Sequence, residues 1–225
     1  MNWQDEGYIV GKKKFSENAI ILDVFTKNFG KVSAIVYGGT SRKIKNYLQL
    51  ANKIFVIFNS KSNNKLGYFK TELIEAISPK YFSNKKKTIC INSLSSIIKV
   101  LLPENENQIK IYSSLESFIH KMDENNWILH YLNWEIDLIN YLGFGFNIDS
   151  RNYTENTNSK IIDVKLDDVI YKIPFFLINK NLKNTGTQDI FAGLSFSRSL
   201  MENKFFIPNN LNFPYSRRLL ERKIL

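Results

Sequence analysis

Basic side chains cluster in the first 45 residues, close to an aromatic ring. Three lysines are consecutive, and a second group of cations follows a pair of glycines. Ammonium and guanidinium groups neutralise phosphates, and an exposed ring gives bases a surface to stack on. This combination predicts binding to a nucleic acid. The candidate residues are Lys12, Lys13, Lys14, Lys31, Tyr37, Arg42, Lys43 and Lys45.

Residues typical of enzyme active sites are scarce. His120 and His130 fall on different predicted helices, where packing or surface roles explain them. The acidic pairs Asp123-Glu124 and Asp167-Asp168 lack the spacing of a two-metal nuclease site. No nucleophile sits in a strained-turn motif, and no glycine-rich loop precedes a phosphate-binding lysine. The sequence therefore predicts a binding protein, not an enzyme, with no catalytic residues and no metal.

A β-hairpin must position the second cationic group. Residues 19–26 and 31–37 read as strands, and Gly30 can supply the positive φ that their tight turn requires. The second strand then leads into a flexible loop that carries Arg42, Lys43 and Lys45. An ordinary hairpin with solvated lysines remains the alternative interpretation, and barrel aromatics such as Tyr37 are more often core residues than stacking surfaces.

The hairpin belongs to a predicted small barrel that spans residues 1–80. A strand begins within 6–14 and runs into a cationic hinge, and further strands are expected at 54–58 and 66–77. Five strands, with a short helical turn at 47–50 between the third and fourth, match an oligonucleotide/oligosaccharide-binding (OB) barrel. Strand count does not separate this from an SH3-like barrel.

Residues 81–225 change to helical periodicity, which makes the chain α+β. The last predicted helix carries Arg217 and Arg218, which are further candidates for binding the phosphates of a nucleic acid. An irregular insertion of strands and loops is expected at about 146–183, with strands at 161–164 and 169–178. The expected helices cover 88–102, 107–123, 127–142, 188–202 (capped by Thr187) and 215–223.

Charge and cysteine content further limit the kind of protein that this sequence can encode. The net charge is +10, and residues 1–80 contribute +7 of it, with 13 basic and 6 acidic side chains. Compositional bias explains a high lysine content but not its concentration at one end, which favours a polyanionic partner. The single cysteine, Cys90, rules out an intramolecular disulfide and a Cys-based zinc site. With no signal peptide and no apolar run of ~18 residues, a cytoplasmic protein without a membrane span is expected.

The motifs, in their order, resemble the RecO family of bacterial recombination mediators that bind DNA. The likeness spans nearly the whole chain, with the motifs in the right order. It is carried by Glu6–Val10, Glu17–Leu22, Val24–Thr26, Gly30-Lys31, Gly38-Gly39, Ser41–Lys43, Trp134–Ile136, Leu142–Gly145, Phe196–Arg198 and Tyr215–Arg217.

The resemblance implies an OB barrel followed by a helical domain, and DNA contacts through Arg42 and Lys43. It also implies that Arg198 and Arg217 belong to a basic surface of the second domain. Many relatives carry a Cys-rich zinc module where this chain has 147–152 without cysteine, so no cofactor is expected. Some relatives place an arginine just before the aromatic-Glu pair, near a pocket for the single-strand binding protein tail, where this chain has Leu132 and Asn133.

Two functions remain open at this point. The resemblance implies a mediator that binds single- and double-stranded DNA, anneals complementary strands and helps load RecA recombinase onto DNA coated with single-strand binding protein. Its implied partners are RecR, single-strand binding protein, RecF and RecA, in a nucleoid-associated location. The alternative is a protein-interaction adaptor whose helical domain docks partner tails and whose nucleic-acid affinity is incidental.

Overall fold

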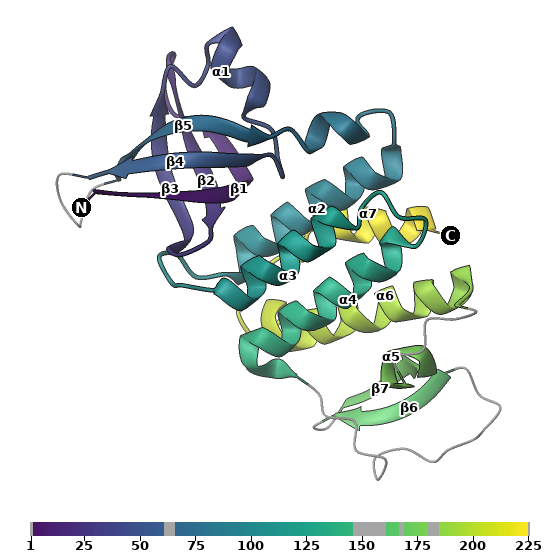
Figure 1. Ribbon diagram of the computed structural model, residues 1–225. Coiled ribbons are helices and arrows are strands. Elements are labelled where there is room, and N and C mark those ends of the chain that lie inside the picture. Colours follow the sequence, from purple (N-terminus) through teal and green to yellow (C-terminus); the bar gives the residue numbers. More distant parts are fainter. Residues whose placement is uncertain (1, 61–65, 146–160, 167–168, 180–184, 225) are drawn as a thin grey trace. The chain divides into compact units, whose positions relative to one another are not determined.

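The computed structural model describes residues 2–60, 66–145, 161–166, 169–179 and 185–224 (Figure 1). The chain forms two compact units. The first comprises Met1–Tyr112 and Pro214–Leu220, and the second comprises Ser113–Phe213 and Glu221–Leu225. The first unit thus includes more than the barrel, while the predicted domain boundary at 80/81 stays a prediction.

A closed barrel of five strands forms the start of the first unit, in the order β1-β2-β3-β5-β4 (Figure 1). Antiparallel pairing joins all neighbours except β3 and β5, which run parallel where Ile35 meets Tyr68. The α+β fold class and the five-stranded OB-type barrel are therefore confirmed. The strands are β1 (Asn2–Lys14), β2 (Ala19–Thr26), β3 (Gly30–Tyr37), β4 (Lys53–Asn59) and β5 (Tyr68–Glu75).

Alternating side chains from these strands fill the barrel. Inward positions carry aliphatic residues such as Leu22 and Val24 of β2 and Val56 of β4, all fully buried. At the turn end of the β2–β3 hairpin, the Trp3 ring stacks between Phe29 and Phe58, with centroids 4.1 and 4.8 Å away. Stacked rings therefore close that end of the barrel core.

Two local predictions near the cationic groups were wrong. Residues 11–14 form no hinge, because β1 continues through Lys14 after a bulge between Ile9 and Gly11 and pairs with β2. The loop after β3 contains a short helix, α1 (Arg42–Tyr47), which begins earlier than the helical turn expected at 47–50. Apolar spacing is too short to mark a six-residue helix whose residues are all at least partly exposed.

The first unit also contains helix α2 (Lys85–Leu101), the start of α3 (Ile109–His120) and the segment Pro214–Leu220. The Asn84 side chain accepts a hydrogen bond from the Lys87 amide and caps α2. Tyr112 of α3 contacts the rings of Tyr8 and Phe25, whose centroids lie 5.5 and 5.7 Å away. These contacts are aromatic, so the barrel wall and the first turn of α3 share one apolar layer.

Helices dominate the second unit, as predicted. The α4 helix ends in a π-helical turn, Asn140–Phe144, where Gly143 takes a φ of 89°. The carboxylate of Glu135 accepts a 2.6 Å hydrogen bond from Ser197, and both side chains are fully buried. This bond ties together the two longest helices that lie within the unit. The elements are α4 (Trp127–Ile139), β6 (Ile161–Leu166), β7 (Val169–Pro174), α5 (Phe175–Asn179), α6 (Thr187–Met201) and the end of α7 (Tyr215–Ile224).

Part of the expected insertion is described, as the β6–β7 hairpin. The strand predicted at 169–178 ends at Pro174, and α5 follows it. Proline has no N–H to continue a ladder, so the strand ends there. Residues 146–160, 167–168 and 180–184, including the segment that replaces the zinc module of relatives, lie outside the described residues.

We predict that Gly30→Ala destabilises the protein by more than about 1 kcal/mol, because alanine would be strained at this φ and would also clash. Gly30 has a φ of 68°, and a Cβ there would lie too close to the Glu106 carbonyl oxygen of the α2–α3 connection. Gly38→Ala is the matched control, since its φ is 70° but its Cβ would meet only Ile44 at 3.6 Å. Chemical denaturation measures both. Equal losses would show that backbone strain alone explains the effect.

Candidate nucleic-acid interface

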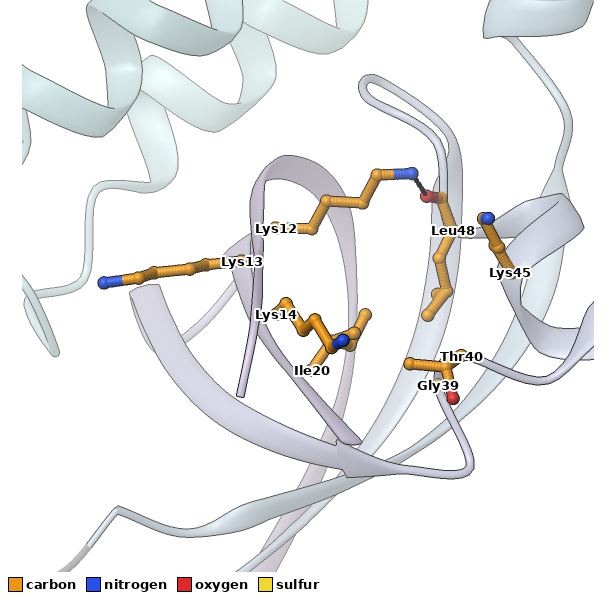
Figure 2. A pocket seen from close by; sticks show the side chains of 8 residues that line it. All are labelled: Lys12, Lys13, Lys14, Ile20, Gly39, Thr40, Lys45 and Leu48. Atoms are coloured by element: carbon orange, nitrogen blue, oxygen red, sulfur yellow. Dashed lines mark hydrogen bonds between the residues drawn. The ribbon is translucent and has the colours of Figure 1, made fainter. Parts of the chain in front are cut away.

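The end of β1 presents its lysines on two sides. In the β1–β2 register Lys12 faces Leu22 and Lys14 faces Ile20, and both partners belong to the barrel core. Directly opposed residues of an antiparallel pair share a face, so these two lysines lie on the inner face of β1. Lys13 lies on the other face, and its side chain points away from the other two in Figure 2.

Helix α1 brings a second set of cations to the same end of the barrel. Arg42, Lys43 and Lys45 are all exposed. The ammonium group of Lys12 donates hydrogen bonds to the Leu48 carbonyl at 2.7 Å and to Gln49 Oε1 at 3.3 Å. These bonds fix the end of β1 against the segment that follows α1. The two cationic sets, predicted separately, are therefore adjacent.

A pocket of about 330 Å³ lies between β1 and α1. We call it the barrel-mouth pocket, since core residues Ile20 and Leu48 line it beneath the lysines (Figure 2). Partial burial of the Lys12 ammonium group, and then the nearby charge of Lys45, lower the pKa of Lys12. The lining residues are Lys12, Lys13, Lys14, Ile20, Gly39, Thr40, Lys45 and Leu48.

Sequence reasoning missed the apolar and neutral part of this pocket. Ile20 and Leu48 read as ordinary core residues, and Thr40 as part of a loop. The register of β2 against β1 contains the only available signal, since it places Ile20 directly opposite Lys14. That register depends on the bulge in β1, whose one sign in the sequence is Gly11 inside the strand.

Tyr37 is exposed, as a stacking surface requires. Its side chain is 64% exposed at the end of β3, and its ring lies 6.1 Å from the ring of Tyr68 on β5. Phe15, which follows the lysine triplet, is 54% exposed and was not predicted. Aromatic surface of this kind can stack on bases without regard to sequence.

Among the basic candidates of the barrel, Lys31 differs from the others because its side chain is not exposed. It is buried, and its ammonium group donates a 2.6 Å hydrogen bond to the Lys99 carbonyl near the end of α2. Burial is the main cause that lowers the pKa of Lys31, partly opposed by Glu104 and Asp23. A buried ammonium offers no surface to a phosphate in this conformation, so the proposed interface omits Lys31.

The C-terminal arginines differ in their surroundings. Arg198 of α6 bonds through Nε to Glu221 at 2.9 Å and through Nη1 to Glu202 at 3.1 Å. Arg217 is fully buried, whereas Arg218 is exposed. Arg218 is thus the one candidate of the three that presents an open surface in the described structure.

The described residues offer no site for a metal ion. No group of three or more His, Cys, Asp or Glu side chains is close enough within them to hold one. Cys90, the only cysteine of the chain, is buried in α2. The donor set therefore does not fit the Cys-rich zinc module of relatives, although the prediction of no zinc stays a prediction. No helix in the described part of the chain is long and apolar enough to cross a bilayer.

The strand order and the exposed cations and rings at one end place this barrel in the OB class, a fold that binds oligonucleotides or oligosaccharides in other proteins. Comparison with family models identifies the family of this chain. Residues 1–77 match the family model "Recombination protein O N terminal", and residues 83–161 match "Recombination protein O C terminal". The chain belongs to the RecO family.

Full-length relatives agree with this assignment. A protein of Wolbachia pipientis subsp. Culex pipiens is 31% identical over 98% of this chain and 98% of its own length. A protein of Ehrlichia chaffeensis is 30% identical over 96% of this chain and 83% of its own length. Both are named "DNA repair protein RecO". A solved structure, Entamoeba histolytica asparaginyl-tRNA synthetase, aligns over 95% of this chain and 59% of its own at 8% identity, but its TM-score of 0.29 supports no conclusion.

We predict that Arg198→Met lowers the free energy of unfolding by about 1–3 kcal/mol, because it removes charge-assisted hydrogen bonds from the buried Glu221 carboxylate. Its effect on DNA affinity should be small by comparison. Arg222→Met, which removes an exposed arginine from α7, is the control and should change stability by no more than about 0.5 kcal/mol. Thermal denaturation and binding to a labelled oligonucleotide provide the two readouts. A stable Arg198 variant with weak DNA binding would contradict the structural role.

Proposed function

We propose that this protein is a non-catalytic mediator of recombinational DNA repair. It binds single- and double-stranded DNA through the cationic end of the barrel and anneals complementary strands. It also helps load RecA recombinase onto DNA coated with single-strand binding protein, in contact with RecR and RecF, in the nucleoid-associated cytoplasm. Family membership and the names of the relatives support the role in DNA repair.

The observation that carries DNA binding is the meeting of two cationic segments at the barrel mouth. Lys13 and Lys14 come from β1, and Arg42, Lys43 and Lys45 come from α1. All five side chains are exposed, and the Lys12–Leu48 hydrogen bond holds the two segments together. Exposed cations gathered at one end of the barrel create a positive potential that attracts a polyanion of any sequence.

Annealing follows from charge neutralisation without any covalent step. Two strands repel each other through their phosphates, and cations that contact both strands reduce that repulsion. Tyr37 and Phe15 add exposed rings, and stacking contributes about 1–3 kcal/mol per base where a ring is free to stack. The bases keep their Watson–Crick edges available, so complementary partners can pair.

The position of the relatives' arginine carries no cation in this chain, where Leu132 is buried and Asn133 is half-buried. Leu132 is fully buried and packs against Gly193, where an added Cβ would lie only 2.5 Å from Leu132 Cδ2. It therefore packs within the second unit. An acidic tail would require exposed cations, and we assign no residues of this chain to that contact.

We predict that Lys43→Met/Lys45→Met weakens binding to single-stranded DNA and flattens its salt dependence. Each lost phosphate contact reduces the slope of log K against log salt by about 0.7, so two contacts reduce it by roughly 1.4. The matched control is Lys85→Met/Lys86→Met, which removes two exposed lysines from the start of α2. Titration of a labelled oligonucleotide at several salt concentrations gives the slopes.

Strand annealing on complementary DNA coated with single-strand binding protein tests the mediator role. The wild type should accelerate annealing, the α1 variant should lose most of the acceleration, and the α2 control should keep it. If the α1 variant bound and annealed DNA like the wild type, the cationic end would not be the interface. The adaptor function would then be the better explanation.

A further inference from the structure

The inner face of β1 carries lysines where the barrel would be expected to carry apolar residues. Lys12 and Lys14 face Leu22 and Ile20 of the core across the β1–β2 ladder. Strand β4 does not cover them, because its pairing with β1 ends at Tyr8. The two lysines therefore extend from the core wall into the barrel mouth, where their ammonium groups can reach solvent.

The barrel-mouth pocket combines an apolar floor with a cationic rim. Ile20 and Leu48 form the floor, and Lys12, Lys14 and Lys45 form the rim (Figure 2). Gly39 contributes backbone to the wall, since a Cβ there would lie 2.7 Å from Ile20 Cγ1. No carboxylate lines the pocket. The rim charges therefore repel one another. Burial, and then the nearby charge of Lys45, lower the pKa of Lys12.

The group that fits this rim carries more than one negative charge. An internal phosphodiester of DNA carries one. A terminal phosphomonoester carries about −1.5 to −2 at pH 7 and has three strong acceptor oxygens, which matches three ammonium groups. The volume of about 330 Å³ falls within the range of small-molecule sites, which occur in barrel mouths. The apolar floor gives the attached sugar or base a surface to cover.

We propose that the barrel-mouth pocket binds the terminal nucleotide of a DNA strand through its phosphomonoester. The phosphate lies among Lys12, Lys14 and Lys45, and the sugar or base covers Ile20 and Leu48. This inference rests on the proposed DNA-binding function and adds to it a preference for phosphorylated strand ends. Such a preference would place the protein at strand breaks and gap borders, where annealing begins.

The test compares oligonucleotides of one sequence that carry a 5′-phosphate, a 3′-phosphate or hydroxyls at both ends. Full-length wild-type protein should bind at least one phosphorylated form about tenfold more tightly than the hydroxyl form. The two phosphorylated arms show which end the pocket accepts. Equal affinity for all three oligonucleotides would overturn the proposal while leaving DNA binding intact.

Matched lysine variants separate the pocket from general charge. Lys14→Met and Lys45→Met should reduce the phosphate preference to nearly onefold. Lys43→Met, on α1 outside the pocket lining, is the control and should keep the preference while weakening the binding of all three oligonucleotides alike. An equal loss of preference in all three variants would mean that diffuse charge, not the pocket, causes it.

Free thymidine monophosphate distinguishes failure of this inference from failure of the proposed function. If the wild type bound no oligonucleotide, the proposed function would fail. Thymidine monophosphate should still bind more tightly than inorganic phosphate or thymidine, and Lys45→Met should abolish the difference. Thymidine monophosphate that bound no more tightly than inorganic phosphate would overturn the nucleotide pocket as well.

Discussion

Strand β1 pairs with two neighbours in turn, and the barrel depends on that double pairing. Residues 2–8 pair with β4, and residues 7–14 pair with β2, with a bulge between Ile9 and Gly11. A bulge bends a strand and increases its twist, which lets one strand serve both sides of a closed sheet. Because β4 leaves β1 at Tyr8, the last inner positions of β1 face an open mouth. The closure of the barrel thus creates the space that the lysines occupy.

Cations in this protein divide into those that hold the fold and those that remain at the surface. Lys31 donates a hydrogen bond to the Lys99 carbonyl, and Arg198 donates hydrogen bonds to Glu202 and Glu221. A buried charge without such partners would destabilise the fold by several kcal/mol. These cations therefore keep their protein partners and are not available to bind a ligand. Lys14 and Lys45 have no ion-pair partner among the described residues and lie in a pocket without carboxylates. Surface position and lack of acidic neighbours, not charge alone, define a phosphate site.

The sequence predicts the elements better than the environment of individual cations. Residues 19–26 form β2 as predicted, because the run is apolar and β-branched and a glycine turn follows it. Burial of Lys31 could not be predicted, since it depends on the α2–α3 connection, where Asn105 donates a hydrogen bond to the Lys31 carbonyl from 74 positions further along the chain. Helix α1 was missed because its stability depends on contacts outside the helix, such as the Tyr47 hydroxyl bonded to Thr71 at 2.9 Å. Contacts that are distant in sequence decide these features, and residue spacing does not record them.

Exposure determines how each group of cations responds to salt. Exposed charges separated by more than about 8 Å are largely screened at physiological ionic strength, whereas partly buried charges are screened much less. Arg42 and Lys43 belong to the first kind, as do Lys14 and Lys45 at the pocket rim, whereas the ammonium group of Lys12 is partly buried. Salt therefore weakens the contacts of the exposed cations before it weakens a contact with Lys12. In the proposed annealing function, this order would release the body of a strand before the group bound near Lys12.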